Sequence, residues 1–418
     1  MRGFSRLKWR YVIALALLLA TASIAFVYRQ AGRALRRAAR EVSASAELEV
    51  AINRPAATVT AFEWISAPAA FSGAALFQGD LWLCGASGLF RFDSHGKLLK
   101  HYRPGQELPA AALLRITSGV LRDAKTPELL LATSGEGILA FNGADFRQIL
   151  PSDPDARSVT ALLPLSSGDL LVGTRKHGVL VYDGQKLRLF HPGLAALHVT
   201  ELAGTVSDLW VGTQDRGVVH WQSGAAETFS ESGGLPDPQV FSIALAGGKA
   251  FVGTAAGVAE FDRGRFVRVL ALGALARTLY ATDSTLLIGA SGEGLLELSL
   301  QRSGRLPGPP RPSAGAVSDV QQIFPAEGAV YAVTPGSLFV RDGSRAGWRR
   351  LISPETTLLT DRNISALAID EGQRLWVGYF DRGLDIFSPD LRQATHLEDD
   401  NVFCVNRILP DPGSGATA

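Results

Sequence analysis

The sequence predicts an all-β fold, a β-propeller of about eight four-stranded blades preceded by an N-terminal transmembrane or signal helix. Three observations predict it. A short phrase recurs eight times, its copies are 36 to 47 residues apart, and each copy alternates apolar residues as a β-hairpin does. The clearest pair is "LWVGTQDRGVVHW" at residues 209–221 and "LWVGYFDRGLDIF" at residues 375–387.

The N-terminal segment precedes the repeats. The basic stretch "MRGFSRLKWR" leads into residues 11–28, an uncharged run of 18 residues that is long enough to cross a bilayer. A cleaved signal peptide is the alternative, because Ala20-Thr21-Ala22 fits a cleavage site. We expect residues 1–28 to be a cytoplasmic tail with an anchor or signal peptide, and residues 29–57 to be a helical stalk or linker. Arginines at residues 29–40 leave the orientation of the span open.

Residues 58–409 hold the repeats, and each repeat contains four apolar or alternating runs. In one unit the hairpin is preceded by "VTALLPL" (159–165) and followed by "KLRLFH" (186–191). Four short antiparallel strands, which we call A to D in chain order, make one propeller blade. Helical repeats would place apolar residues at i, i+3, i+4 and i+7, and no unit does so. Residues 410–418, "PDPGSGATA", are predicted to be a disordered tail.

The repeated phrase resembles the two-component-regulator propeller repeat. The fullest copy runs from Gly234-Leu235-Pro236 into "FVGTAAGVAEFD" (251–262), and another is "NISALAIDEGQRLWVG" (363–378). The resemblance covers about residues 70–400. Such repeats typically build periplasmic sensor regions of hybrid histidine kinases. The resemblance therefore implies a single-pass inner-membrane protein with its propeller in the periplasm, or a secreted propeller if the signal is cleaved.

Charge and motifs disfavour several function classes. The formal net charge is +1, so the body of the chain lacks the basic surface that nucleic-acid binding needs. Seven histidines occur, and none has metal-ligand spacing to another histidine or to a cysteine. The sequence also has no phosphate-binding loop and no nucleophile elbow. We expect no metal, no cofactor and no nucleic-acid partner.

The leading hypothesis is a membrane-tethered, non-catalytic module that binds a polar ligand or a partner protein. A signalling output would then pass through a separate chain, because no kinase or DNA-binding module follows residue 400. A propeller enzyme of the lyase or glycoside hydrolase kind is one alternative. A structural fragment of a larger receptor is the other.

The candidate binding residues lie in the turns between strands B and C. In an antiparallel blade these turns emerge at the same face as the connectors between strand D and the next strand A, and loops on a rigid scaffold commonly carry binding residues. The candidates are Lys176, His177, Asp215, Arg216, Asp381 and Arg382. We expect them to ring the mouth of the central channel, with merely solvated turns as the alternative.

The innermost strands and the tryptophans are predicted to be core. The A strands read as packing sequences such as "ALLPL" and "SIALA", which carry no catalytic groups. Trp82, Trp210 and Trp376 recur at one B-strand position, which favours packing between blades over a sugar-stacking platform.

The two ends of the repeat region predict a closing seam. The run "NVFCVNRIL" (401–409) alternates like strand A of a ninth unit, and "TVTAFEWIS" (58–66) reads as a D strand without a blade. We expect these runs to meet where the ring closes. Closure would bring Cys84 and Cys404 into neighbouring blades as a candidate disulfide, with two unpaired thiols as the alternative.

Overall fold

The computed structural model describes residues 47–54, 70–300, 308–313, 317–342, 347–352, 359–361, 363–390, 393–399 and 402–409. Within these residues the chain forms eight antiparallel sheets, each built on four strands that are hydrogen-bonded in chain order. The all-β prediction and the four strands of each unit are therefore confirmed. None of the described helices is long and apolar enough to cross a membrane, and the predicted anchor at 11–28 lies outside the described residues.

The first four sheets follow one another along the chain, and each contains four strands that pair in chain order. The first sheet contains β3 (Phe71–Phe77), β4 (Asp80–Gly85), β5 (Gly88–Phe92) and β6 (Leu98–Tyr102). The second contains β7 (Leu113–Gly119), β8 (Glu128–Thr133), β9 (Ile138–Phe141) and β10 (Phe146–Pro151). The third contains β11 (Val159–Pro164), β12 (Leu170–Thr174), β13 (Val179–Tyr182) and β14 (Leu187–Leu189). The fourth contains β15 (Val199–Gly204), β16 (Asp208–Thr213), β17 (Val218–Gln222) and β18 (Ala225–Phe229).

The remaining four sheets repeat this order. The fifth contains β19 (Val240–Ala246), β20 (Lys249–Thr254), β21 (Gly257–Asp262) and β22 (Arg265–Leu270). The sixth contains β23 (Ala276–Ala281), β24 (Thr285–Ala290), β25 (Gly294–Ser299) and β26 (Arg311–Pro312). The seventh contains β27 (Gln322–Ala326), β28 (Ala329–Val333), β29 (Leu338–Asp342) and β30 (Arg349–Ile352). The eighth contains β31 (Ile364–Ile369), β32 (Leu375–Tyr379), β33 (Leu384–Phe387) and β34 (Ala394–Leu397).

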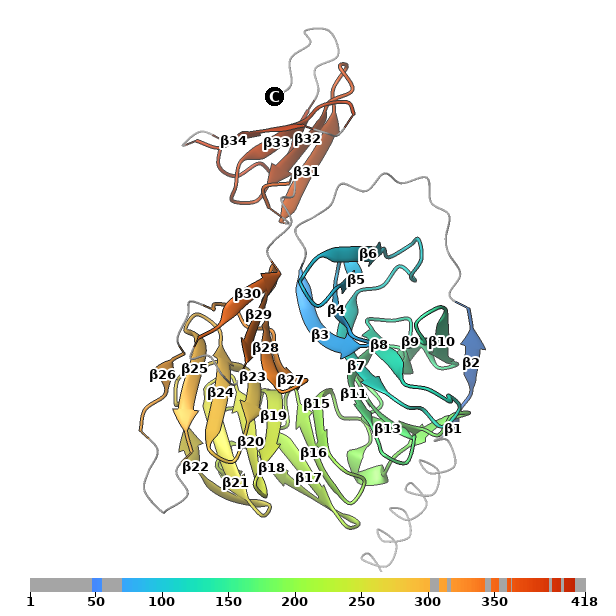
Figure 1. The fold of residues 1–418 in the computed structure, drawn as a ribbon, viewed down its shortest axis with the longest axis vertical. Coiled ribbons are helices and arrows are strands. Elements are labelled where there is room, and N and C mark those ends of the chain that lie inside the picture. Colours follow the sequence, from blue (N-terminus) through green and yellow to red (C-terminus); the bar gives the residue numbers. More distant parts are fainter. Residues whose placement is uncertain are drawn as a thin grey trace, which may run out of the picture.

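Seven of these sheets close into a ring, with β3, β7, β11, β15, β19, β23 and β27 gathered at its centre (Figure 1). Seven apolar clusters of described residues fill the seven junctions between neighbouring sheets. At the closing junction, Phe71 and Phe90 of the first sheet pack with Leu338 of the seventh. The Phe71 backbone N–H also donates to the Pro335 carbonyl at 2.9 Å. The ring therefore has seven blades rather than eight.

The eighth sheet stands outside this ring, as Figure 1 shows. It has a small core of its own, in which Val377, Tyr379 and Phe387 pack with Leu359 from the connector that precedes it. Its first strand leaves Leu367 and Ile369 60% or more exposed. The prediction that all eight units share one ring is therefore wrong for the last unit.

The C-terminal run lies against the eighth sheet and not at the ring seam. Val405 donates its backbone N–H to the Tyr379 carbonyl at 3.0 Å, which places residues 402–409 beside β32. The run at 58–66 lies outside the described residues. Cys84 is buried in β4, Cys404 is exposed, and both thiols are free, so the predicted disulfide is not formed.

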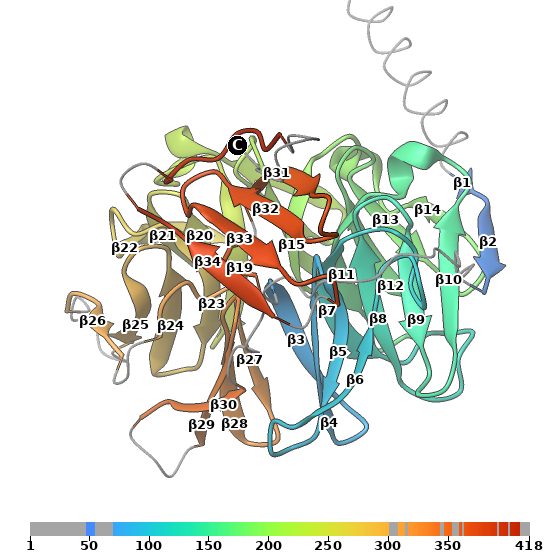
Figure 2. The same cartoon turned by 90° about the horizontal axis from the view of Figure 1, so that it is seen from above.

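The start of the described chain differs from the predicted helical stalk. Strand β1 (Glu47–Leu48) pairs with β14, and β2 (Val50–Asn53) pairs with β10, both antiparallel. They add a fifth strand to the outer edges of the third and second sheets, as Figure 2 shows. Residues 29–46 and 55–57 of the predicted stalk lie outside the described residues. Three short 3₁₀ helices, all in D–A connectors, complete the described elements: Pro154–Ala156, Pro192–Leu194 and Glu231–Gly233.

Candidate functional site

A β-bulge near the start of the innermost strand recurs around the ring. In six ring sheets the pairing register shifts by one residue there, for example between Leu113 and Arg115 and between Val199 and Glu201. A bulge re-aims side chains and often lies beside a functional site. Here the bulges occur in the strands that surround the ring centre, so they decide which side chains face it.

The ring centre encloses a cavity of about 220 Å³, lined by residues from all seven ring sheets. Its lining contains three charged side chains, Arg115 on β7, Glu201 on β15 and Arg277 on β23. Arg115 and Glu201 follow bulges at the same strand position, with the small Ala161 on the sheet between them. Arg277 occupies the bulge of the sixth sheet. The charged groups of the cavity lining are therefore two guanidinium groups and one carboxyl group.

The two arginines keep donors available to a ligand. Arg115 donates to the neighbouring Leu114 carbonyl at 3.0 Å, and Arg277 makes long hydrogen bonds to Ser291 (3.4 Å) and Gln321 (3.5 Å). A guanidinium carries five N–H donors, and no ion pair within the described residues involves either arginine. Unpaired guanidinium groups in a narrow polar channel are suited to binding an anion.

Glu201 is held in an unusual protonation environment. Burial raises the pKa of its carboxyl group above the ordinary range, and the nearby Arg115 charge opposes that rise only in part. Within the described residues its carboxyl group accepts one hydrogen bond, from the Leu202 backbone N–H at 3.3 Å. Desolvation favours the neutral carboxylic acid, which is itself a hydrogen-bond donor.

An amide on the seventh sheet adds a further donor. The Gln322 Oε1 accepts the Ala74 backbone N–H at 2.6 Å, which ties the seventh sheet to the first and leaves the amide NH₂ group as its remaining polar group. The apolar part of the lining comes from Ile116, Leu162 and Phe241. The channel thus combines directed donors with a small apolar wall, as ligand sites commonly do.

Sequence reasoning missed these channel residues because it assigned the A strands to packing. Most units carry Gly73, Ala161, Ser242 or Thr278 after the bulge, whereas two carry Arg115 and Glu201. The sequence did carry one signal, because these two units have a charged residue where the other units have a small one.

The predicted turn residues of the third sheet pair with the preceding connector. Lys176 Nζ lies 2.7 Å from Asp155 Oδ1, and His177 Nε2 lies 2.9 Å from Asp153 Oδ2. B–C turns and D–A connectors therefore share one face, as the antiparallel order requires. Both side chains of the Lys176–Asp155 pair are well exposed, so this ion pair contributes little to stability.

The other predicted residues are divided between the ring and the eighth sheet. Asp215 and Arg216 lie in the B–C turn of the fourth sheet, and the Arg216 backbone N–H donates to Thr213 Oγ1 at 3.0 Å. Asp381 and Arg382 lie in the hairpin of the eighth sheet, where Arg382 is 3.5 Å from Glu398. The prediction that they help ring the channel mouth is therefore wrong. None of the six predicted residues lines the channel cavity, and their contact with a ligand stays a prediction.

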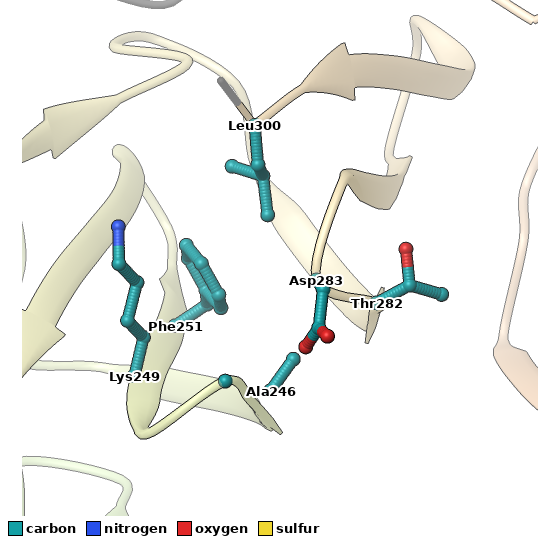
Figure 3. Close-up of a pocket in the computed structure, with 7 residues that line it drawn as sticks. Ala246, Lys249, Phe251, Thr282, Asp283 and Leu300 are labelled. Atoms are coloured by element: carbon teal, nitrogen blue, oxygen red, sulfur yellow. The ribbon is translucent and has the colours of Figure 1, made fainter. Parts of the chain in front are cut away.

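Two adjoining pockets lie at the opposite face, beside the turn between β19 and β20. The pocket in Figure 3 has a volume of about 300 Å³ and lies between the fifth and sixth sheets, with Lys249, Phe251 and Asp283 in its wall. Its neighbour, of about 310 Å³, includes His220 and Asp208. Lys249 is paired with Glu260 at 2.6 Å, and His220 with Asp208 at 2.7 Å. These charges already have partners, so the central channel is the stronger candidate.

Comparisons with known proteins support the fold. No family model matches the chain, and no curated protein matches it. Among solved structures, the WD40 repeats of RRP9 match with a TM-score of 0.51 and 12% identity, over 68% of this chain and 93% of that one. Virginiamycin B lyase from Staphylococcus aureus matches with a TM-score of 0.49 and 12% identity, over 69% and 97%.

The extracellular domain of a putative hybrid two-component system from B. thetaiotaomicron also matches. The TM-score is 0.45 and the identity 16%, over 88% of this chain and 56% of that one, so this chain spans about half the length of that domain. At 12% identity the likeness to the RRP9 repeats shows the propeller fold alone. Within the described residues, no three histidine, cysteine, aspartate or glutamate side chains are grouped to hold a metal ion.

Proposed function

We propose that this chain is a membrane-tethered, extracytoplasmic propeller that binds a polar ligand in its central channel and catalyses no reaction. The channel is the observation that carries the proposal. Seven sheets converge on a cavity whose guanidinium and amide donors have few partners in the protein. The resemblance of the repeats to sensor propellers and the apolar run at residues 11–28 support the location.

The channel chemistry favours binding over catalysis. Glycoside hydrolysis commonly uses a pair of carboxyl groups, and Glu201 is the one carboxyl group in the described channel lining. A general base also works best when an orienting partner holds it, whereas Glu201 accepts only a long bond from its neighbour's backbone. A propeller enzyme of the lyase or hydrolase kind and a structural fragment of a larger receptor remain the alternative functions.

A ligand screen tests the binding role. We expect at least one class among organic acids, amino acids, sugars and phosphate esters to raise the melting temperature of the purified chain, because a ligand of the folded state stabilises it. The double variant Arg115→Gln/Arg277→Gln should lose this shift, and Lys125→Gln/Arg265→Gln, which removes two exposed cations outside the cavity, should keep it. A shift that survives the channel variant, or no shift with any class, would contradict the proposal.

The exposed thiol of Cys404 offers a test of location. Burial raises the pKa of the Cys84 thiol to about 11, so that cysteine stays protonated and unreactive near neutral pH. A membrane-impermeant maleimide applied to intact spheroplasts should therefore label the chain at Cys404 alone, and Cys404→Ser should abolish labelling. Labelling that requires lysis of the cells would place the propeller in the cytoplasm.

A further inference from the structure

We propose that the channel ligand is a small organic carboxylate that binds between Arg115 and Arg277. The ionised form of Glu201 repels this carboxylate. This inference rests on the proposed binding function and adds the ligand class. It also makes binding depend on the protonation of one residue.

The donors select an anion. Arg115 on β7 and Arg277 on β23 enter the cavity from the second and sixth sheets, so a ligand between them meets cationic groups from two directions. A guanidinium presents parallel N–H groups that match a carboxylate bidentately. Neither arginine has a carboxylate partner within the described residues, so a bound anion displaces no protein carboxylate.

The size and the apolar wall select an organic anion over inorganic phosphate. A cavity of about 220 Å³ is larger than a phosphate ion needs and admits a ligand of several carbon atoms. Ile116, Leu162 and Phe241 supply apolar contacts in the same cavity. A carboxylate with a short aliphatic or aromatic body would use both parts of the lining.

Glu201 couples binding to pH. The charged groups that line the cavity with it are Arg115 on β7 and Arg277 on β23, and the remaining polar lining consists of hydroxyl groups and the amides of Gln321 and Gln322. An ionised Glu201 competes for the arginines and repels a bound carboxylate, whereas a neutral Glu201 can donate a hydrogen bond to it. Its raised pKa keeps the neutral form populated to higher pH than for an ordinary glutamate. Binding should therefore tighten as the pH falls.

Calorimetric titration of the full chain tests this coupling with three probes, which are pyruvate, benzoate and inorganic phosphate. We expect a carboxylate to bind more tightly at pH 4.5 than at about pH 8, because a Glu201 whose pKa lies above the ordinary 4.5 is mostly protonated at the lower pH and no longer repels it. Glu201→Gln should bind equally well at both pH values and, at the higher pH, more tightly than the unsubstituted chain. Arg115→Gln and Arg277→Gln should each weaken binding by about tenfold or more.

Matched controls keep the outcomes distinct. Lys125→Gln and Arg265→Gln remove exposed cations from the ring without touching the cavity and should leave titrations unchanged. Melting curves identify any variant that fails to fold, and Arg115→Lys keeps the charge while losing the bidentate geometry, so it should retain part of the affinity. Tighter binding of phosphate than of both carboxylates would overturn the ligand class. A neutral ligand found in the screen, together with no binding of these anions, would overturn the inference and leave the proposed binding function standing.

Discussion

The same hairpin phrase occurs in the ring and in the eighth sheet, and its surroundings differ. In the fourth sheet, Trp210 is 4% exposed, stacks on His220 at 4.1 Å and lies 5.1 Å from the Phe261 ring of the fifth sheet. In the eighth sheet, Trp376 is only half-buried, and its Nε1 donates to Asp370 at 3.0 Å. The phrase specifies the hairpin in both places, whereas burial of its tryptophan requires a neighbouring blade.

The A strands of the ring and of the eighth sheet differ in burial in the same way. Leu202, Ile243 and Leu279 occupy one A-strand position in three ring sheets and are 9% exposed or less. Leu367 occupies that position in the eighth sheet and is 62% exposed. A repeat of this kind cannot bury its own faces, so its stability depends on stacking against others. The eighth sheet should therefore be the least stable part of the described chain.

Truncating the two tryptophans should give the largest contrast. Trp210→Ala removes a large side chain from a closed junction and should lower the free energy of unfolding by about 3–5 kcal/mol. Trp376→Ala should cost about 1 kcal/mol or less, because the side chain already contacts water. Denaturant titrations measure both. Equal losses would mean that the eighth sheet is packed as closely as the ring.

Gly212 in the ring and Gly378 in the eighth sheet occupy the same B-strand position. A Cβ on Gly212 would lie 2.7 Å from Val240 Cγ1, and one on Gly378 would lie 2.6 Å from Val405 Cγ1. Val240 is fixed at the start of a ring strand, so Gly212→Ala should cost about 1–3 kcal/mol through overpacking.

Gly378→Ala should cost less, because residues 402–409 form no strand and can move away. Hydrogen exchange should then show faster exchange in 402–409 and an unchanged ring. Loss of ring protection in Gly378→Ala would contradict the separation of the two regions.

A pH response confined to the eighth sheet is the smallest expected effect. His396 lies between Asp385 (2.7 Å) and Glu398 (3.1 Å). Burial lowers the His396 pKa, but hydrogen bonds to Glu398 and Asp385 outweigh it and raise the pKa above the ordinary 6.5. The stabilisation is thus fully present below about pH 6.5 and is lost as the pH rises through the folded-state value.

Limited proteolysis measures this response. Cleavage within residues 363–399 should accelerate as the pH rises above about 6.5, while the ring sheets stay protected. His396→Gln should remove the pH dependence, because glutamine does not titrate. A pH response of the same size in the His396→Gln chain would assign the effect to another group.

The sequence predicted the units better than their assembly. Even the unit at Val333, which lacks the usual glycine, forms its four strands, because apolar alternation and turn residues act locally. Ring closure is different, since it depends on whether Leu338 and Ile352 of the seventh sheet fit against Phe71 of the first. That fit depends on blade tilt and side-chain volume, and the spacing of the repeats predicts neither.

The candidate site was predicted only in part for a related reason. Equal spacing of the phrase implied equal places for Arg216 and Arg382, but one lies in the ring and the other in the eighth sheet. Arg115 and Glu201 were overlooked because a bulge turns them toward the channel. The extra residue of a bulge shifts the alternation of side chains along the strand, and the repeated phrase does not mark where that shift occurs.

Strands β1 and β2 have a mechanical consequence. Residues 50–53 pair with β10 and residues 47–48 with β14, so the chain is fastened to two neighbouring sheets before it enters the ring. A pull exerted from upstream of Glu47 would meet the pairing of β1 with β14 first and the longer pairing of β2 with β10 after it. Figure 2 shows both strands at the outer edge of their sheets. Force applied at Glu47 would therefore enter the fold at its circumference, on the strands farthest from the ring centre.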